Sequence, residues 1–551
     1  MSGTRETWNL GALGAAVEAR LDAWQKAEVG RRLWAKDPTI WAEPGTPEVV
    51  DRLGWLTLPG EMAARLPELE SFGALLAEDE MRHALVLGMG GSSLAPEVFQ
   101  ETFDNRGGYP ELRVLDSTHP EAVLALAGTI DATRSVFLVS SKSGGTTETM
   151  SYYRYFWQSV VQVSETPGAA FAAVTDPGTS LEKLARDRGF RWLFSAQADV
   201  GGRYSALTPF GLAPAAAIGV DLSGLLARAA AMAATCGGEV AAADNPGLRL
   251  GAALGELARA GRDKVTFLTS PALHAFPDWL EQLVAESTGK HGQGIVPVAG
   301  EAPAEPAAYG ADRFFVGLSL AGEEGPLADR LAELAGAGHP TAHFALGERL
   351  DLGAEMFRWE VAVAMAGAVL GIQPFDQPDV QLAKDLSARA MKGELPAGEA
   401  GEEAGVAAPD LAATLGRFLG GAQTGDYLGI HAYLAPSPER TATLRRLQAL
   451  ARDRTRLATT LGYGPRFLHS TGQLHKGGPA ICRFLQLVDR PAEAVPVPET
   501  DYTFAKLIRA QADGDRQALA GRGRPVLRID LGADATAGLA ALEAALAGEA
   551  P

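Results

Sequence analysis

The sequence has few cysteines, no excess of positive charge and no long apolar run. Only Cys236 and Cys482 are cysteines among 551 residues. Two thiols so far apart form neither a disulfide framework nor a zinc cluster, and they suit a reducing compartment. The longest apolar stretches, near 207–220 and 361–372, fall short of the ~20 residues that span a bilayer. The N-terminus lacks the apolar run of a signal peptide, so we expect a soluble, cytoplasmic protein.

Basic residues are outnumbered: 49 Lys and Arg face 67 Asp and Glu, a net charge of −18. A surface with this much negative charge repels nucleic-acid phosphates and anionic lipid. We therefore expect neither nucleic acid nor a membrane as partner. The nine histidines are scattered without metal-ligand spacing, and no serine-hydrolase elbow occurs. We therefore expect neither a metal nor a cofactor. A composition of 46% hydrophobic and 21% charged residues is typical of a globular chain with a sizeable core.

Short apolar runs alternate with helix-length segments from residue 81 onward, after an N-terminal segment, 1–80, that is predicted to be helical. Strands are predicted at 84–88, 112–116, 136–140 and 171–175, and in a second series at 265–269, 314–318, 342–345 and 428–434. Buried strands alternating with helices indicate βαβ units and parallel sheets. The predicted fold class is α/β, with two three-layer units in tandem.

The two units are placed at 81–243 and 244–500, with the turn cluster 244–247 as the junction. Segment 393–409, rich in Gly, Glu, Ala and Pro, is expected to be a mobile loop. A C-terminal extension, 501–551, holds one more predicted strand at 526–530 and a closing helix.

Two loops rich in glycine and hydroxyl groups follow strands of the first unit. The first, Gly88-Met-Gly-Gly-Ser-Ser93, lets the backbone approach a ligand, but Ser93 in place of a third glycine disfavours a dinucleotide. The second, Ser140 to Thr149, combines hydroxyls, two glycines and a lysine, and suits one phosphate. A capping box around Thr146 is the structural alternative. Both loops follow carboxyl ends of strands, where open α/β sheets bind ligands.

Five motifs in order resemble those of the phosphoglucose isomerase family. They are Gly88–Ser93, Ser141–Thr149, a G-G-R-[FY]-S match within Val200–Thr208, the E-S-x-G-K match Glu286–Lys290, and Gly371–Lys384, which is similar to N-P-F-D-Q-x-x-V-x-x-x-K. The flanks, 1–80 and 390–551, look like the isomerase part of transaldolase–phosphoglucose isomerase fusions. The resemblance implies tandem sugar-isomerase (SIS) domains. It also implies reversible conversion of glucose 6-phosphate and fructose 6-phosphate through an enediolate, in glycolysis and gluconeogenesis, and a homodimer with the site near the subunit boundary.

The resemblance also implies catalytic roles. Glu286 would be the base that moves a proton between C1 and C2, Arg203 would stabilise the enediolate, and Lys384 would assist ring opening. The ring-opening histidine is assigned to His469, whose H-S-x-G-Q sequence lies beyond Lys384 instead of soon after E-S-x-G-K. The alternatives that stay open are His291, His339 and His475. An exposed helix carboxylate is the structural alternative for Glu286, and a salt bridge for Arg203.

Further residues are expected to bind the substrate, a small sugar phosphate. They are Gly91, Ser92, Ser141, Lys142, Ser143 and Thr146 near the phosphate, Gly202 beside Arg203, and Gln282 and Gln377 on the sugar or phosphate. Mannose 6-phosphate as an additional substrate stays open. A phosphosugar-sensing module without catalysis is the other alternative. It predicts loss of the base, the arginine or the lysine, and all three are present.

Overall fold

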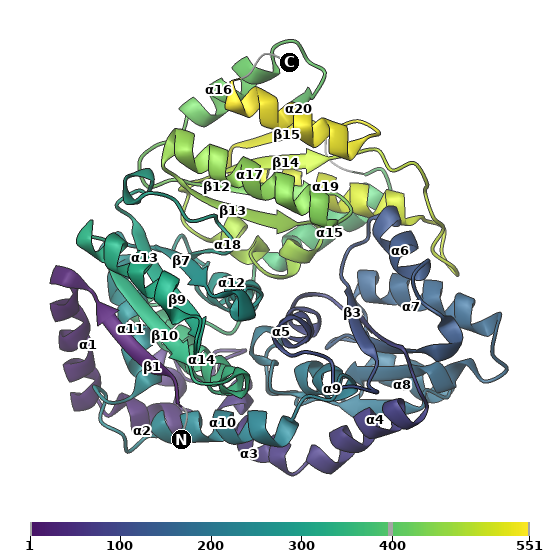
Figure 1. The fold of residues 1–551 in the computed structure, drawn as a ribbon, viewed down its shortest axis with the longest axis horizontal. Helices are drawn as coiled ribbons and strands as arrows, with labels where there is room; N and C mark the ends of the chain where they lie inside the picture. Colours follow the sequence, from purple (N-terminus) through teal and green to yellow (C-terminus); the bar gives the residue numbers. More distant parts are fainter. Residues whose placement is uncertain (1–2, 395–400, 549–551) are drawn as a thin grey trace.

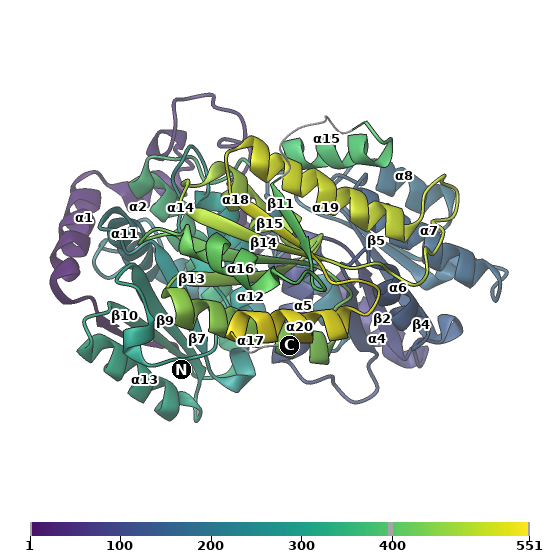
Figure 2. The ribbon, with the colours of Figure 1, turned by 90° about the horizontal axis from the view of Figure 1, so that it is seen from above.

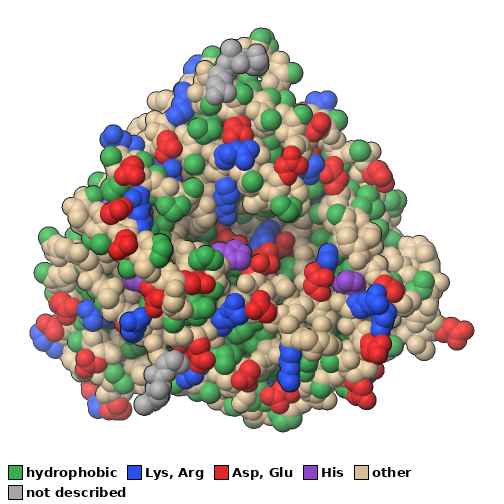
Figure 3. Space-filling model, in the orientation of Figure 1, with side chains coloured by type: hydrophobic (Ala, Val, Ile, Leu, Met, Phe, Trp, Pro, Cys, Tyr) green, Lys and Arg blue, Asp and Glu red, His purple; other side chains and the backbone are tan. Residues whose placement is uncertain are grey.

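Three five-stranded sheets organise the computed structural model, which describes residues 3–394 and 401–548. We call them the first lobe (order β3-β2-β4-β5-β6), the second lobe (β1-β10-β9-β7-β8) and the third lobe (β11-β15-β14-β12-β13). They lie at the corners of a triangle, the third at the top of the view (Figure 1). The space-filling view shows a hollow where the lobes meet, with histidine and charged side chains of both signs around it (Figure 3). The α/β class with parallel sheets is therefore confirmed.

The first lobe is an all-parallel sheet. Its strands are β2 (His83–Leu87), β3 (Glu111–Leu115), β4 (Ser135–Ser140), β5 (Phe171–Thr175) and β6 (Trp192–Ser195). Its helices are α4 (Leu66–Glu78), α5 (Leu94–Thr102), α6 (Pro120–Ala127), α7 (Thr147–Val161), α8 (Ser180–Asp187) and α9 (Pro209–Ala217). Every residue of β4 and β5 is buried, which explains their continuous apolar sequence. The four predicted strands are present; β6, four residues at the edge, was too short to predict.

The second lobe contains four parallel strands and one antiparallel edge strand. The parallel strands are β7 (Lys264–Thr269), β8 (Val296–Val298), β9 (Arg313–Leu320) and β10 (Thr341–Leu346). The edge strand β1 (Arg5–Asn9) comes from the N-terminal segment, for which only helices and loops were expected. Its sequence is mostly polar and it is half-buried at most, so it carries no strand signal. The other helices here are α1 (Gly14–Lys26), α2 (Val29–Trp34), α3 (Leu58–Ala63), α10 (Leu222–Thr235), α11 (Pro246–Arg259), α12 (Phe276–Thr288), α13 (Glu324–Gly336) and α14 (Leu352–Leu370).

The first two lobes share one hydrophobic core. A single cluster includes Val86 and Leu138 of the first sheet and Val316 and Phe344 of the second. The turn at 244–247 lies inside this body, where the side chain of Asn245 caps α11 by accepting from the Leu248 amide. That turn therefore begins a helix within a continuous core.

The third lobe differs from the predicted arrangement of two units. Its parallel strands are β11 (Glu402–Gly405), β12 (Tyr427–Tyr433), β13 (Ala458–Tyr463), β14 (Cys482–Val488) and β15 (Val526–Asp530), covered by α16 (Leu411–Gly420), α17 (Pro438–Thr455), α19 (Phe504–Gly521) and α20 (Ala535–Ala547). The strand expected at 428–434 in the second unit thus belongs to a separate sheet with a core of its own, and β15, expected in the C-terminal extension, completes that sheet. Strands β13 and β14 were not predicted. Part of the expected loop 393–409 is strand β11, and residues 395–400 lie outside the described residues.

The third lobe packs against the first beside α15 (Val380–Met391) and α18 (Gly472–Gly477). Helices α15 and α19 run side by side next to α7 of the first lobe (Figure 2). Val495, Val497 and Phe504 complete an apolar cluster on the first sheet, and the Phe504 ring stacks on Tyr152 at 6.1 Å. Among the described residues, no helix is both long and apolar enough to cross a membrane.

Candidate functional site

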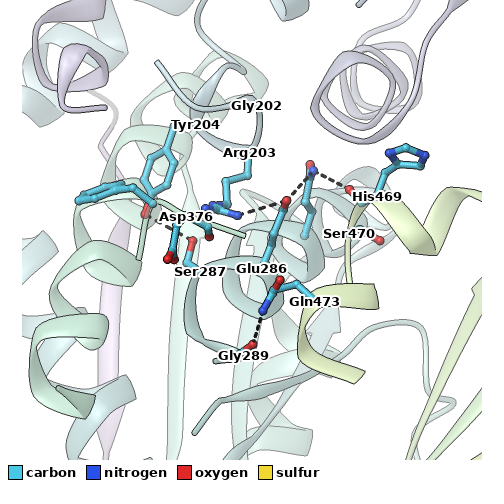
Figure 4. Close-up of polar contacts among 12 residues, drawn as sticks. Gly202, Arg203, Tyr204, Glu286, Ser287, Gly289, Asp376, His469, Ser470 and Gln473 are labelled. Atoms are coloured by element: carbon cyan, nitrogen blue, oxygen red, sulfur yellow. Dashed lines mark hydrogen bonds and ion pairs between the residues drawn. The ribbon is translucent and has the colours of Figure 1, made fainter. Parts of the chain in front are cut away.

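Glu286 lies in the last turn of α12, and its side chain is 11% exposed. Its Oε1 is 3.2 Å from Nη1 of Arg203, and its Oε2 accepts from Nε2 of Gln282, one turn earlier, at 3.1 Å. Figure 4 shows Arg203, Glu286 and the backbone of His469 joined in one row of polar contacts. Glu286 is therefore not an exposed helix carboxylate; it is held between a cation and an amide.

Arg203 is buried on the turn Gly202–Tyr204. Its Nη2 donates to the carbonyl of Asp376 at 2.8 Å, in addition to the contact with Glu286. A side chain at Gly91 would overlap the carbonyl oxygen of Gly202, so glycine there lets the 88–93 loop pack directly on the arginine loop. The two glycine-rich motifs thus form one surface beside Glu286.

Lys290, the last residue of the E-S-x-G-K match, lies beneath this cluster. Its Nζ is 2.6 Å from Oδ1 of Asp376 and donates to the carbonyl of Gln373 at 2.9 Å. Burial, reinforced by the charge of Arg203, lowers the pKa of Lys290 to about 7. Lys290 therefore fixes the loop on which Arg203 rests and does not itself reach the cavity described next.

A cavity of about 410 Å³ opens between the start of α7, α15, α19 and the turn that carries His469. The expected residues that line it are Ser143, Thr146, Lys384 and His469, and its other lining residues include Gly145, Thr147, Glu148, Lys506 and Gln511. The first-turn amides of α7 have no carbonyl partner within the helix and suit an anion. The cavity therefore combines helix-start amides that suit an anion with titratable side chains.

Thr146 does not cap α7 with its side chain. Its hydroxyl contacts the hydroxyl of Ser141 instead, at 2.9 Å. The capping-box alternative is therefore wrong, and both hydroxyls belong to the loop that faces the cavity.

His469 is paired with a buried carboxylate. Its Nε2 is 3.0 Å from Oε1 of Glu148, in the first turn of α7. Burial disfavours the ionised carboxyl, but the charge of His469 and its hydrogen bond outweigh that effect, so the pKa of Glu148 is lowered. The carbonyl of His469 accepts from Nε2 of Gln282 at 2.8 Å, so the same amide contacts both Glu286 and the histidine turn.

The other three candidate histidines lie elsewhere. His291 is exposed, the His339 ring packs on Phe315 in the second lobe, and the His475 ring stacks on His431 in the third. His469 alone among the four candidates lines the cavity.

Some expected binding residues point elsewhere in this structure. Nζ of Lys142 lies 2.5 Å from Oδ2 of Asp176, so its ammonium is directed away from the phosphate loop. Gln377 is half-buried and does not line the cavity. Ser92 is buried in the glycine loop.

One histidine–carboxylate group with ligand atoms close enough for a metal ion occurs among the described residues: His119, Glu121 and Asp489. Both ring nitrogens of His119 already have protein partners. Nε2 is 3.0 Å from Oδ1 of Asp489, and Nδ1 accepts from the amide of Glu121. We interpret this group as a hydrogen-bonded link between the first and third lobes.

Sequence reasoning missed Glu148 and Gln511. Glu148 was inside the quoted Ser141–Thr149 motif but received no role, although a carboxylate at a helix start is a signal. Gln511 lies in the C-terminal segment, which no motif covers. Its amide donates to Oε1 of Glu148 at 2.7 Å, and nothing in its local sequence indicates this contact.

Comparison with known proteins gives consistent matches. The family model described as "Phosphoglucose isomerase" matches residues 73–301. The glucose-6-phosphate isomerase of Rubrobacter xylanophilus is 30% identical over 410 residues, 65% of this chain and 93% of that protein. The enzyme of the same name from Symbiobacterium thermophilum is 31% identical over 60% of this chain and 85% of that protein.

Solved structures show the same fold. A hypothetical protein from Thermus thermophilus superposes with a TM-score of 0.59 at 25% identity, covering 70% of this chain and 99% of that one. A glucose-6-phosphate isomerase from Chlamydia trachomatis superposes with a TM-score of 0.60 at 18% identity, covering 76% and 92%. Together with the relative matched over nearly its whole length, these findings show that the chain belongs to the phosphoglucose isomerase family.

Proposed function

We propose that this chain is a glucose-6-phosphate isomerase, an aldose–ketose isomerase acting on glucose 6-phosphate and fructose 6-phosphate in glycolysis and gluconeogenesis, in the cytoplasm. The observation that carries the proposal is that two carboxylates are joined at the turn of His469. Glu148 and His469 line the cavity, and Gln282 links Glu286, which does not line it, to the carbonyl of His469. Glu286 lies between Arg203 and Gln282, and Glu148 is paired with His469. Conversion of a cyclic sugar phosphate needs two kinds of proton transfer, ring opening and then exchange between C1 and C2, and each pair suits one of them.

The substrate phosphate binds at the loop Ser141–Thr147. The hydroxyls of Ser141, Ser143 and Thr146 and the first-turn amides of α7 supply donors there, and Ser143, Thr146 and Lys384 line the cavity. Lys142 contributes through its backbone, because its ammonium is engaged by Asp176. This end of the cavity fixes the sugar so that its ring lies toward His469.

His469 opens the ring with Lys384 nearby. A ring nitrogen of His469 gives a proton to the ring oxygen as the C–O bond breaks, and the anomeric hydroxyl releases its proton to solvent as the carbonyl forms. Glu148 stabilises the imidazolium form of His469 before the transfer. Lys384 lies on the same cavity, where its positive charge favours the developing negative charge on oxygen.

Glu286 then removes the proton from C1 of fructose 6-phosphate and returns it to C2. The enediolate between these steps carries negative charge, and the buried guanidinium of Arg203 stabilises it without reorganising. Gln282 links the base to the histidine turn. In the proposed reaction it also binds a sugar hydroxyl. No step in this sequence uses a metal ion or a cofactor.

The experiment is conversion of fructose 6-phosphate by the purified chain with EDTA present, with glucose 6-phosphate read through a coupled dehydrogenase. Wild type should turn over, and Glu286→Gln should lose about 10²- to 10⁴-fold in kcat, the typical contribution of a general base. Glu281→Gln, a carboxylate on the same helix α12, is the matched control and should remain active. Binding of fructose 6-phosphate by calorimetry without turnover would contradict the proposal in favour of a phosphosugar-sensing module.

A further inference from the structure

Glu148 accepts a second hydrogen bond, from a residue of the third lobe. Nε2 of Gln511 on α19 donates to Oε1 of Glu148 at 2.7 Å, and Oε1 of Gln511 accepts from Oγ1 of Thr118 at 2.6 Å. Gln511 is 3% exposed and Thr118 is fully buried. Thr118, Gln511, Glu148 and His469 therefore form one continuous hydrogen-bonded chain that ends at the cavity.

The chemistry of the groups fixes the direction of this chain. An ionised carboxylate can only accept, so Gln511 must turn its NH₂ group toward Glu148. Its carbonyl oxygen is then left to accept from the Thr118 hydroxyl, which holds the amide in this orientation. On the other side, Nε2 of His469 also contacts Oε1 of Glu148, so Nδ1 is the ring nitrogen that can exchange a proton with a substrate.

The helix that carries Gln511 supports the histidine segment at a second point. One turn further along α19, Oδ1 of Asp515 is 2.7 Å from Nζ of Lys476 on α18, and both side chains are buried. Helix α18 directly follows the turn of His469. Both contacts restrain the same short segment relative to Glu148.

We infer that Gln511 is a positioning residue for ring opening, which acts by holding the Glu148 carboxylate that orients His469. The inference rests on the proposed isomerase function. It gives the C-terminal segment, 501–551, a role in the reaction: α19 orients the ring-opening pair, whereas the C1–C2 base Glu286 is held by Arg203 and Gln282, without a contact to Gln511.

The test compares a substrate that must be opened with one that is already open. Fructose 6-phosphate is mainly cyclic, whereas 5-deoxyfructose 6-phosphate lacks the hydroxyl that closes the ring. Gln511→Leu keeps the size of the side chain and removes the donor. We expect kcat/KM for fructose 6-phosphate to fall about 10- to 100-fold, the scale of a misplaced catalytic group, and kcat/KM for the 5-deoxy substrate to stay within about twofold of wild type.

Two further variants keep the test decisive if Gln511→Leu does not fold. Thr118→Val removes the hydroxyl that fixes the Gln511 amide and should give a smaller loss with the same preference for the open substrate, while Thr118→Ser should restore wild-type behaviour. Gln448→Leu is the matched control. Gln448 is another fully buried glutamine of the third lobe; it donates to the carbonyl of Thr459 in the interior of that lobe.

Each outcome decides the matter. An equal loss on both substrates would show that Gln511 is only structural. No loss on either substrate would show that the hydrogen bond from Gln511 to Glu148 does not contribute to the reaction. Either result would overturn the inference while the isomerase function stood. A wild-type protein inactive on both substrates would instead contradict the proposed function.

Discussion

Lys290 is buried beneath Arg203 and Glu286, and its shifted pKa makes the stability of the fold depend on pH. Lys290 has an ordinary pKa near 10.5 and a pKa of about 7 in the folded chain, because burial and the neighbouring Arg203 disfavour its charged form. Above pH 7 the unfolded chain therefore holds a proton that the folded chain releases. By linkage, this group adds stability as pH rises between about 7 and 10.5, the reverse of a lysine stabilised by a surface salt bridge.

The corresponding prediction compares wild type with Lys290→Met. The free energy of unfolding of wild type relative to the variant should rise by about 1.4 kcal/mol per pH unit between pH 7 and pH 9. Denaturant unfolding of both proteins at the two pH values measures the difference. A difference that does not change with pH would show that Lys290 keeps its proton in the folded chain.

Single residues also show the reach of sequence reasoning. The motifs that contain Arg203, Glu286 and His469 were recognised from their own short sequences, and tertiary contacts with Gln282 and with one another bring the three residues together. Lys142 shows the converse: its loop was recognised, but the direction of its ammonium depends on Asp176, 34 residues away. The role of Gln511 could not be predicted from the sequence, because only its tertiary partners distinguish it from other glutamines in helices.

At the scale of elements, a buried ion pair joins α18 to α19. Because α18 follows the turn of His469, this pair helps to hold that turn in place. Nζ of Lys476 is 2.7 Å from Oδ1 of Asp515, and Nδ1 of His431 is 3.5 Å from the other carboxylate oxygen. Burial opposes ionisation, yet the charge of Lys476 and the contacts with His431 lower the pKa of Asp515. Removing one partner would leave the other charge buried and unpaired.

Asp515→Asn and Lys476→Met should therefore each lower the free energy of unfolding by about 3–5 kcal/mol, the usual cost of breaking a buried pair. The double variant should lose clearly less than the sum of the two single losses, because no unpaired charge remains. Thermal and denaturant unfolding of the four proteins measures this coupling. Additive losses would mean that the two charges do not interact.

Elements were predictable where apolar runs were continuous and fully buried. The strands β2, β3, β4, β5, β7, β9, β10, β12 and β15 were all indicated by short apolar runs, whereas β8, β13 and β14 were not predicted. Strand β1 was not, because an exposed antiparallel edge strand needs few apolar residues. The grouping of strands was not predictable either: β12 and β15 resemble the strands of the second lobe in sequence, and only their hydrogen-bonded pairing shows that they belong to a separate sheet.

For the whole molecule, the main consequence of the third lobe is that one chain contains all the groups of the proposed reaction. Arg203, Glu286, Lys384, His469 and the phosphate loop come from a single copy, with His469 and Gln511 supplied by the third lobe. A homodimer, which the family resemblance implied, would add nothing to this set of side chains. The specific activity should therefore stay constant on dilution from micromolar to nanomolar protein, while sedimentation reports the oligomeric state. A loss of activity that follows dissociation would show that a second copy contributes to the site.

In the proposed reaction, ring opening and C1–C2 proton transfer use separate groups: His469 with Glu148, and Glu286 with Arg203. The most direct test of this separation is a two-by-two measurement of kcat/KM for Glu286→Gln and His469→Gln on fructose 6-phosphate and on 5-deoxyfructose 6-phosphate. We expect Glu286→Gln to lose activity on both substrates. His469→Gln should lose about 10²-fold or more on fructose 6-phosphate while staying near wild type on the open-chain substrate. Equal losses for His469→Gln on both substrates would contradict the assignment of His469 and Glu148 to ring opening.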